Sequence, residues 1–416
     1  MTAIARLRQI VAENRAGRHA GIPSWCTAHR ETLQAILRFY RGNDEPILIE
    51  ATCNQVNQDG GYTGMTPAAF RDFVHALADE AGIERTRFVL GGDHLGPNPW
   101  KTLRASDAMA KAKEMVRAYV EAGFLKIHLD ASMACADDGE LSEEEIAARA
   151  AALATVAEEH AAGRELVYVI GTEVPRPGGE TEQLAQLAVT EPQAVLRTWE
   201  LHRSAFEANG LRDALSRVIG IVVQPGVDFG NNQVFAFDKA KAAMLSAAVA
   251  GVPGAVFEAH STDYQTQRAL TDLVASHFAI LKVGPELTAA YREAVVAMAA
   301  IEEWLPAARK SGMLQVIDDV MTADPKFWRD YVAERPRARL ERLFGLSDRI
   351  RYYWPNAAIQ EALGVLRRNI DAASDELGLI RQFPNLWEDH HPGLSLSQRI
   401  IQARVGAVVA KYVGAC

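Results

Sequence analysis

Acidic and imidazole side chains follow short apolar runs at three points of the sequence. Asp93 and His94 follow one run, Glu173 ends a second, and His260 ends a third. Two imidazoles and a carboxylate are a ligand set for a catalytic divalent ion, so we predict a metal site formed by His94, Glu173 and His260. Zinc suits these donors best, with manganese, nickel and iron as alternatives. Asp93 and Glu173 are the candidate catalytic acids or bases, and ordinary buried hydrogen bonds are the alternative role for each histidine.

Further polar residues near the ends of such runs suit a ligand that carries many hydroxyl groups. Carboxylate and amide groups form the hydrogen bonds that sugar hydroxyls need, and local capping of loops is the alternative. Lys282 is open to two interpretations, a buried Schiff-base amine or a hydrogen-bond donor to substrate or to an acid. The predicted substrate-binding residues are Glu50, Asn54, Gln55, Asp130, Gln224, Asp263 and Lys282.

The elements that would bring these residues together form a repeated pattern. Eight short apolar runs each end in a polar residue or a turn, and amphipathic helical segments lie between them. Thr66 with Pro67, and Ser142 with Glu145, are typical helix starts. Strands that are almost wholly apolar are buried on both faces, which indicates a parallel, enclosed sheet. The runs cover residues 20–26, 47–51, 87–94, 124–130, 166–173, 218–225, 255–260 and 278–285.

Eight such units predict a protein of the α/β class, a (β/α)₈ TIM barrel. The proposed metal ligands end the third, fifth and seventh runs, and side chains from alternate strands share one layer of a barrel. A doubly wound open sheet is the alternative, but the glycine-rich phosphate turn expected after its first strand is missing. The glycine-rich residues 60–64 lack a P-loop lysine and dinucleotide spacing, so we predict a flexible loop over the barrel mouth.

The pattern changes after about residue 305. We predict that residues 1–305 form the barrel and that residues 306–416 form a C-terminal helical appendage packed on it, because prolines interrupt helical segments there. Arg349, Arg351 and Tyr352 belong to a charged and aromatic stretch of this appendage. They indicate either a lid whose arginines contact phosphate or packing of the appendage on the barrel wall.

Composition excludes several classes of partner. The 416 residues carry a formal net charge of -9, which does not suit nucleic acid, because phosphates need a basic surface. The four cysteines lack the spacing of a disulfide framework or a zinc finger, so we expect a reducing, cytoplasmic setting. Residues 1–20 lack the apolar run of a signal peptide, and no later stretch reaches membrane-spanning length. The sequence is compatible with a homo-oligomer and does not decide the oligomeric state.

Several stretches, in order along the chain, carry a family resemblance: EATCNQVNQDGGYTGMTP, LGGDHLGPNPW, KIHLDASMAC, YVIGTEVPRPGGE, VVQPGV, EAHSTDYQT, LKVGPELT and SDRIRYYWP. Together they resemble the Z subunit of tagatose-1,6-bisphosphate aldolase, the GatZ/KbaZ family. The resemblance implies a barrel in galactitol or amino-galactose catabolism, with a ketose or ketose phosphate as ligand. It also implies a partner, a Y-type subunit that is a class II aldolase, beside which the Z chain is described as noncatalytic or chaperone-like. The name tagatose-6-phosphate kinase, also used for the family, does not fit, since the sequence has no P-loop and no kinase signature.

The sequence is also distantly similar to class II aldolases themselves. Asp93 and His94 match the catalytic aspartate and the zinc histidine that follows it, and His260 matches another zinc histidine. Glu173 stands where a third histidine is expected. The stretch STDYQ after His260 replaces a glycine-rich turn that binds phosphate through backbone amides, which argues against a bisphosphate substrate for this chain alone.

Three functions remain in view. The leading interpretation is a Z-type subunit, part of an aldolase-type lyase, that retains a divalent-metal site for a ketose. The alternatives are an independent metal-dependent 4-epimerase of tagatose or fructose, and a purely structural partner with a relic site. Aldol cleavage and C4 epimerisation both begin with a metal-bound ketose and a base near the C4 hydroxyl, so one site can serve either reaction.

Overall fold

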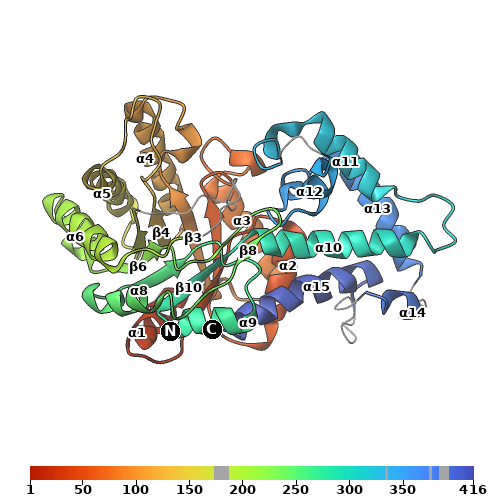
Figure 1. The fold of residues 1–416 in the computed structure, drawn as a ribbon, viewed down its shortest axis with the longest axis horizontal. Coiled ribbons are helices and arrows are strands. Elements are labelled where there is room, and N and C mark those ends of the chain that lie inside the picture. Colours follow the sequence, from red (N-terminus) through yellow and green to blue (C-terminus); the bar gives the residue numbers. More distant parts are fainter. Residues whose placement is uncertain (173–186, 333–335, 374–376, 384–392) are drawn as a thin grey trace.

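A closed barrel of parallel strands forms the centre of the molecule (Figure 1). The computed structural model describes residues 1–172, 187–332, 336–373, 377–383 and 393–416. Within them each of the eight predicted runs contains one strand, which confirms the (β/α)₈ barrel. The last strand pairs with the first and closes the sheet. The barrel strands are β1 (Ile22–Trp25), β2 (Ile47–Thr52), β3 (Phe88–Leu95), β4 (Lys126–Leu129), β5 (Val167–Ile170), β6 (Val218–Val223), β9 (Val256–Ala259) and β10 (Phe278–Val283).

Helices surround the barrel and connect its strands. Two of them begin as their sequences predict: the Thr66 hydroxyl accepts a hydrogen bond from the Ala69 amide, and the Ser142 hydroxyl accepts one from the Glu145 amide. Among the described residues, no helix combines the length and apolar character needed to cross a membrane. The helices before the last strand are α1 (Ala3–Arg15), α2 (Arg30–Phe39), α3 (Pro67–Ala81), α4 (Ala105–Glu121), α5 (Glu143–His160), α6 (Pro192–Ala208), α7 (Arg212–Leu215), α8 (Ala243–Ala247) and α9 (Gln267–Ala275).

Apolar side chains close the N-terminal end of the barrel. Strand residues alternate in direction, so one residue in two points inward. The inward residues at this end are aliphatic, and α1 packs beneath them with Ile4, Leu7, Ile10 and Val11. Any ligand cavity must therefore lie at the opposite end, where the loops after the strands meet.

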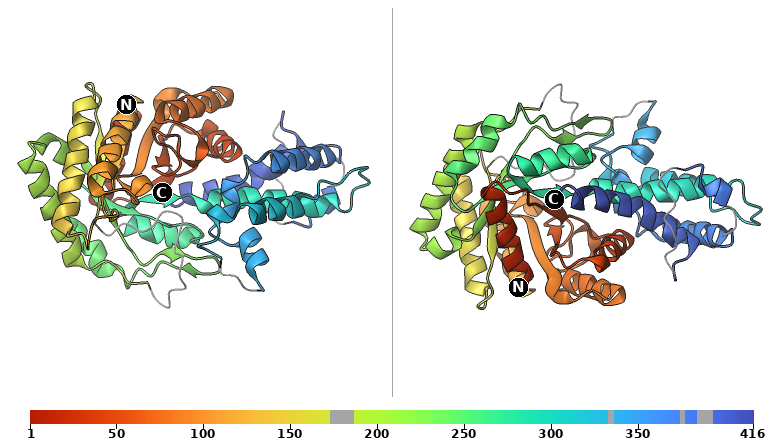
Figure 2. Two further views of the ribbon diagram at one scale, coloured as in Figure 1. Left: turned by 90° about the horizontal axis from the view of Figure 1, so that it is seen from above. Right: turned by 90° about the horizontal axis from the view of Figure 1, so that it is seen from below.

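The helices after β10 stand out from one side of the barrel in every view (Figures 1 and 2). The C-terminal helix α15 packs against α10 and α2, so this extension is joined to the barrel's outer layer. Near its end the Tyr412 hydroxyl donates a hydrogen bond to the Thr262 carbonyl, 2.7 Å away. The predicted domain boundary at residue 305 stays a prediction. The elements are α10 (Pro285–Glu302), α11 (Met313–Ala323), α12 (Ala338–Phe344), the 3₁₀ turn η7 (Arg349–Tyr352), α13 (Ala357–Asp371), α14 (Leu377–Ile380) and α15 (Leu396–Val413).

A short antiparallel pair of strands, which lies between β6 and β9 along the chain, was not predicted from the sequence. It consists of β7 (Asp228–Phe229) and β8 (Val234–Phe235). Two residues per strand are too few for an alternating pattern to be recognised.

Candidate functional site

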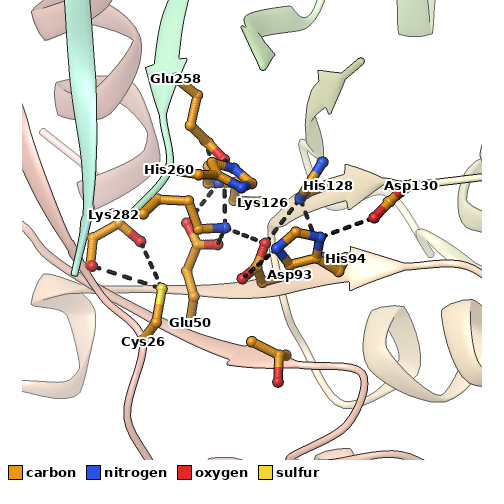
Figure 3. Close-up of polar contacts among 12 residues, drawn as sticks. Cys26, Glu50, Asp93, His94, Lys126, His128, Asp130, Glu258, His260 and Lys282 are labelled. Atoms are coloured by element: carbon orange, nitrogen blue, oxygen red, sulfur yellow. Dashed lines mark hydrogen bonds and ion pairs between the residues drawn. The ribbon is translucent and has the colours of Figure 1, made fainter. Parts of the chain in front are cut away.

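Two lysines and two glutamates point into the barrel above its apolar end, and we call Glu50, Lys126, Glu258 and Lys282 the lysine layer (Figure 3). The Lys126 ammonium is wholly buried and lies 2.6 Å from Glu50 Oε1 and 2.7 Å from Glu258 Oε2. The Lys282 ammonium lies 3.0 Å from Glu50 Oε2 and 3.4 Å from Glu258 Oε1. Gly91 on β3 leaves room for this layer, since a Cβ there would lie 2.7 Å from the Glu50 Cγ. Buried charges need such partners, and here each ammonium has two.

Lys282 also contacts Asp93, which links the lysine layer to the residues above it. Burial by itself lowers the pKa of the Lys282 ammonium, but Asp93, Glu50 and Glu258 together raise that pKa well above its ordinary value. The side chain is therefore a charged ammonium. A Schiff base needs the free amine, so the surroundings of Lys282 fit hydrogen bonding rather than covalent catalysis.

Three imidazoles and one aspartate meet above the lysine layer, and we call Asp93, His94, His128 and His260 the histidine cluster. One possible ligand atom of each residue lies within 4.8 Å of the others. The ring centroid of His94 is 4.9 Å from that of His128 and 4.9 Å from that of His260. The side chains come from strands β3 and β4 and from the residue after β9, so barrel strands and the residue next to one of them assemble the cluster.

Each imidazole of the cluster has a carboxylate on one ring nitrogen. The pairs are His94 Nδ1 with Asp130 Oδ2 at 2.8 Å, His128 Nδ1 with Asp93 Oδ1 at 2.8 Å, and His260 Nε2 with Glu258 Oε1 at 2.9 Å. The other nitrogen of His128, Nε2, is buried and has no hydrogen-bond partner among the described residues. A carboxylate on one nitrogen orients a histidine and leaves the second nitrogen to bind a metal.

The protonation states of side chains in the cluster favour binding of a cation. Burial and the nearby Lys282 ammonium lower the pKa of His260 to about 3, and burial lowers the pKa of His128. Burial opposes ionisation of Asp93, yet His94, Lys282 and His128 hold its pKa well below the ordinary value. Neutral His128 and His260 beside an ionised Asp93 are in the form in which such side chains coordinate a divalent ion. The donor set therefore fits such an ion.

A local irregularity in β3 places His94. The pairing of β3 with β4 shifts in register between Gly92 and Leu95, and His94 has a positive φ of 51°. Its backbone N–H lies 3.1 Å from the Nδ1 of His128. The bulge turns Asp93 and His94 toward the same cluster, although consecutive residues of a regular strand point to opposite faces.

A cavity of about 250 Å³ joins the histidine cluster to loops and to the extension. Glu50 lies beneath it in the lysine layer, and Asp130 lies behind His94. The Gln224 side chain accepts hydrogen bonds from the Gly226 and Val227 amides, a capping role, and it does not belong to the described lining. Glu173 lies outside the described residues. The predicted residues that do line the cavity are Asn54, Gln55, Asp93, His94, His260, Asp263 and Lys282.

Two of these lining residues already have local partners. The Gln55 side chain accepts a hydrogen bond from the Thr52 amide, and Asp263 accepts hydrogen bonds from the Gly284 and Glu286 amides. Burial raises the pKa of Asp263 to about 7 in spite of these hydrogen bonds. The Asn54 side chain has no such bond among the described residues, so its amide is available to a ligand.

Sequence reasoning missed His128, Lys126 and Glu258. All three lie within strands, whereas the predicted site residues come from the ends of the apolar runs or from the loops after them. A signal was present, because Lys126 and His128 alternate with Ile127 and Leu129 in β4. Such alternation puts both polar side chains on the inner face.

The extension supplies another wall of the cavity. Arg351, Tyr352 and Trp354 line it beside Tyr62 from the loop after β2. The rings of Tyr62 and Tyr352 meet edge to face with centroids 4.6 Å apart. The extension therefore contributes to the site as well as packing on the barrel.

A closed parallel barrel with a histidine cluster at its strand ends defines the class, a TIM-barrel protein with a candidate metal centre in a small-molecule cavity. The chain belongs to the GatZ/KbaZ-like family, whose model, described as D-tagatose-1,6-bisphosphate aldolase subunit GatZ/KbaZ-like, matches residues 7–416. Membership assigns the chain to carbohydrate metabolism, as a subunit of the tagatose-bisphosphate aldolase type.

One solved structure supports the fold, and two others are more distantly similar. A crystal structure described as a probable tagatose 6 phosphate kinase from Sinorhizobium meliloti 1021 is 47% identical, with a TM-score of 0.87 over 95% of this chain and 100% of that one. A fructose-bisphosphate aldolase from Campylobacter jejuni is 14% identical, with a TM-score of 0.47 over 92% of this chain and 96% of that one. The YdjI aldolase from Escherichia coli K12 is 12% identical, with a TM-score of 0.43 over 87% of this chain and 98% of that one. The two aldolase similarities are too weak to support a conclusion about fold or function.

Proposed function

We propose that the chain is a Z-type subunit of tagatose-1,6-bisphosphate aldolase that retains a divalent-metal site for a ketose. The observation that carries this proposal is the histidine cluster, in which three imidazoles and Asp93 offer ligand atoms within 4.8 Å of one another. Three imidazoles suit zinc, with manganese or nickel as alternatives. His128 joins His94 and His260 in the proposed ligand set, and Glu173 as a further ligand or acid stays a prediction.

The chain's own groups suit proton transfer on a sugar. A divalent ion held by the cluster would supply Lewis-acid polarisation of a ketose carbonyl. Asp93 is ionised and faces the same cavity, so it can accept the proton of the C4 hydroxyl. Lys282 contacts Asp93 and can stabilise negative charge that develops on the sugar. Asn54 and Asp263 would bind sugar hydroxyls along the cavity wall.

The direct test is metal analysis of chelator-treated and reconstituted protein. We expect about one divalent ion per chain in the wild type, and loss of that ion in His94→Ala, His128→Ala or His260→Ala. Asp93→Asn should keep the ion and lose any turnover, because it keeps the shape of the side chain but cannot take a proton at neutral pH. His160→Ala is the matched control, since His160 is half-exposed and pairs with Glu121 on the barrel's outside. A wild type that binds no stoichiometric ion would make the site a relic and the chain a structural partner.

The second candidate is an independent ketose 4-epimerase. The observation that favours it is the loop after β9, where Ser261 and Asp263 line the cavity in place of a glycine-rich phosphate turn. The purified chain, incubated alone with tagatose, fructose and their phosphates plus divalent metals, distinguishes the two. Interconversion of tagatose and fructose would establish an epimerase, and cleavage to three-carbon products would establish a lyase.

Association with a Y-type class II aldolase in the cytoplasm completes the proposed function. Its support is family membership. Co-expression should raise the partner's activity or half-life. No change in either quantity would favour a chain that acts alone.

A further inference from the structure

Among the charged side chains that line the cavity, Arg351 differs in its surroundings. Lys282 contacts three carboxylates, and Asp263 accepts two backbone hydrogen bonds. The Arg351 guanidinium has no carboxylate at ion-pair distance among the described residues. Its nearest acidic neighbour in sequence, Asp348, is taken by Arg292 at 2.9 Å and by the Thr288 hydroxyl at 2.5 Å. Asp348 therefore acts on Arg351 only from beyond ion-pair distance. A partly buried cation without an ion-paired carboxylate is uncommon because its charge must be compensated.

The hydrogen bonds of Arg351 fix the guanidinium and leave donors free. Nη1 donates to the carbonyls of Ser347 and Asp348, and Nη2 donates to the Tyr352 hydroxyl at 2.9 Å. Nε forms no hydrogen bond with the described residues, and Nη2 keeps a second N–H. Adjacent N–H groups on one edge of a guanidinium suit the two oxygens of a phosphate or a carboxylate.

A second arginine behind the cavity wall adds positive charge without occupying the cavity. Arg349 is buried, and its guanidinium lies 3.7 Å from the Tyr331 ring centroid and 4.6 Å from that of Tyr352. Its Nη1 has no partner among the described residues. Burial opposes ionisation of Tyr352, yet Arg351 and Arg349 lower the pKa of that phenol. Both arginines thus make this wall electropositive, and we call Arg349, Arg351 and Tyr352 the arginine wall.

We propose that the arginine wall is a binding subsite for an oxyanion group carried by the ketose, with Arg351 as the contacting residue. The inference rests on the proposed function and narrows it to an anionic ketose, either a sugar phosphate or a sugar acid. The sugar part lies at the histidine cluster, and the anionic group lies where the extension closes the same cavity. The subsite provides an anion contact in a chain whose loop after β9 lacks a glycine-rich phosphate turn.

The test is titration calorimetry on the full-length, metal-reconstituted chain. The ligands are a neutral ketohexose, its 6-phosphate, its 6-carboxylate and inorganic phosphate. We expect Arg351→Gln to weaken the preferred anionic sugar about 10- to 100-fold, because it removes charge-assisted hydrogen bonds, and to change the neutral sugar less than about twofold. Arg351→Lys keeps the positive charge but loses the paired N–H groups of the guanidinium. Its affinity for the anionic sugar should lie between the affinities of the wild type and of Arg351→Gln. The anionic sugar that loses more affinity identifies the group as phosphate or carboxylate.

The matched control is Arg309→Gln, on the same extension, where the arginine is exposed and paired with Glu361. It should change no affinity. A wild type that binds neutral and anionic sugars equally, or an Arg351→Gln variant that weakens both equally, overturns the inference. If no sugar binds the wild type, the proposed function fails, and inorganic phosphate still tests the subsite. Phosphate binding that Arg351→Gln abolishes would support the subsite, and absence of phosphate binding would then reject it.

Discussion

The lysine layer and the arginine wall contribute to one site, but their positive charges have different partners. In the lysine layer, Lys126 and Lys282 each contact two or more carboxylates, and these contacts join strands from different parts of the barrel. In the arginine wall, Arg349 and Arg351 contact aromatic rings and backbone carbonyls, with no carboxylate at ion-pair distance among the described residues. The lysine layer is thus compensated by its own carboxylates, whereas the arginine wall keeps donors and charge that the proposed anionic ligand would use.

The largest effect expected from this comparison concerns Lys126. Lys126→Met should lower the free energy of unfolding by about 3–5 kcal/mol, because it leaves the buried Glu50 and Glu258 without one of their cations. Urea unfolding measures the change. Lys111→Met is the control, since Lys111 pairs with Asp59 on the surface at 3.1 Å and should cost about 1 kcal/mol or less. Similar losses in both variants would show that the lysine layer is not a special source of stability.

Removal of a paired carboxylate outside the cavity should lower the free energy of unfolding by an intermediate amount that depends on pH. Arg149 forms two hydrogen bonds with Asp138 and holds its pKa at about 2, below the ordinary value. A depressed folded-state pKa gives stability that is present above about pH 4 and is lost as pH falls toward 2. Asp138→Asn should therefore cost about 2 kcal/mol at pH 7, and less at pH 3. Denaturant unfolding at several pH values checks this, and a cost that does not shrink at low pH would contradict it.

The smallest effect is expected in the arginine wall. Arg349→Met removes two cation–π contacts and the hydrogen bond from Nε to the Phe327 carbonyl, but it also removes a buried guanidinium whose Nη1 has no partner among the described residues. These changes oppose each other, so the free energy of unfolding should change by about 1 kcal/mol or less. The same urea measurement as for Lys126→Met applies. A loss of unfolding free energy as large as that of Lys126→Met would mean that the positive charges of both regions contribute equally to stability.

The fold followed from the sequence more completely than the site did. Buried parallel strands appear as apolar runs, so all eight were found. His94 and His260, predicted from the ends of the third and seventh runs, both lie in the histidine cluster. His128 was missed because a rule based on alternate strands gives no place to a residue of β4. The bulge at His94 brings β3 and β4 together at the cluster. The glycines Gly91 and Gly92 are a sequence sign of an irregular strand, but they do not say which side chains the bulge turns inward.

The role of the extension was also beyond the sequence. Both interpretations of its arginines were open, because residue types do not say which side chain faces a cavity. The structure separates the two: Arg351 lines the cavity, whereas Arg349 packs behind it between Tyr331 and Tyr352. Only the path of the chain after β10 decides this, and that path depends on long-range packing rather than on local pattern.

The hydrogen bond from Tyr412 to Thr262 has a consequence for how the chain is made. Thr262 lies in the loop after β9, two residues beyond His260, and its partner is 150 residues further along the chain. At about 5–20 residues per second, a ribosome needs roughly 8–30 s to deliver Tyr412 after that loop has been synthesised. Until then, the loop beside the histidine cluster lacks this partner, and α10 and α2 expose the apolar surface that α15 covers. The loop beside the histidine cluster would therefore gain this support only after α15 has been synthesised and has packed against the barrel.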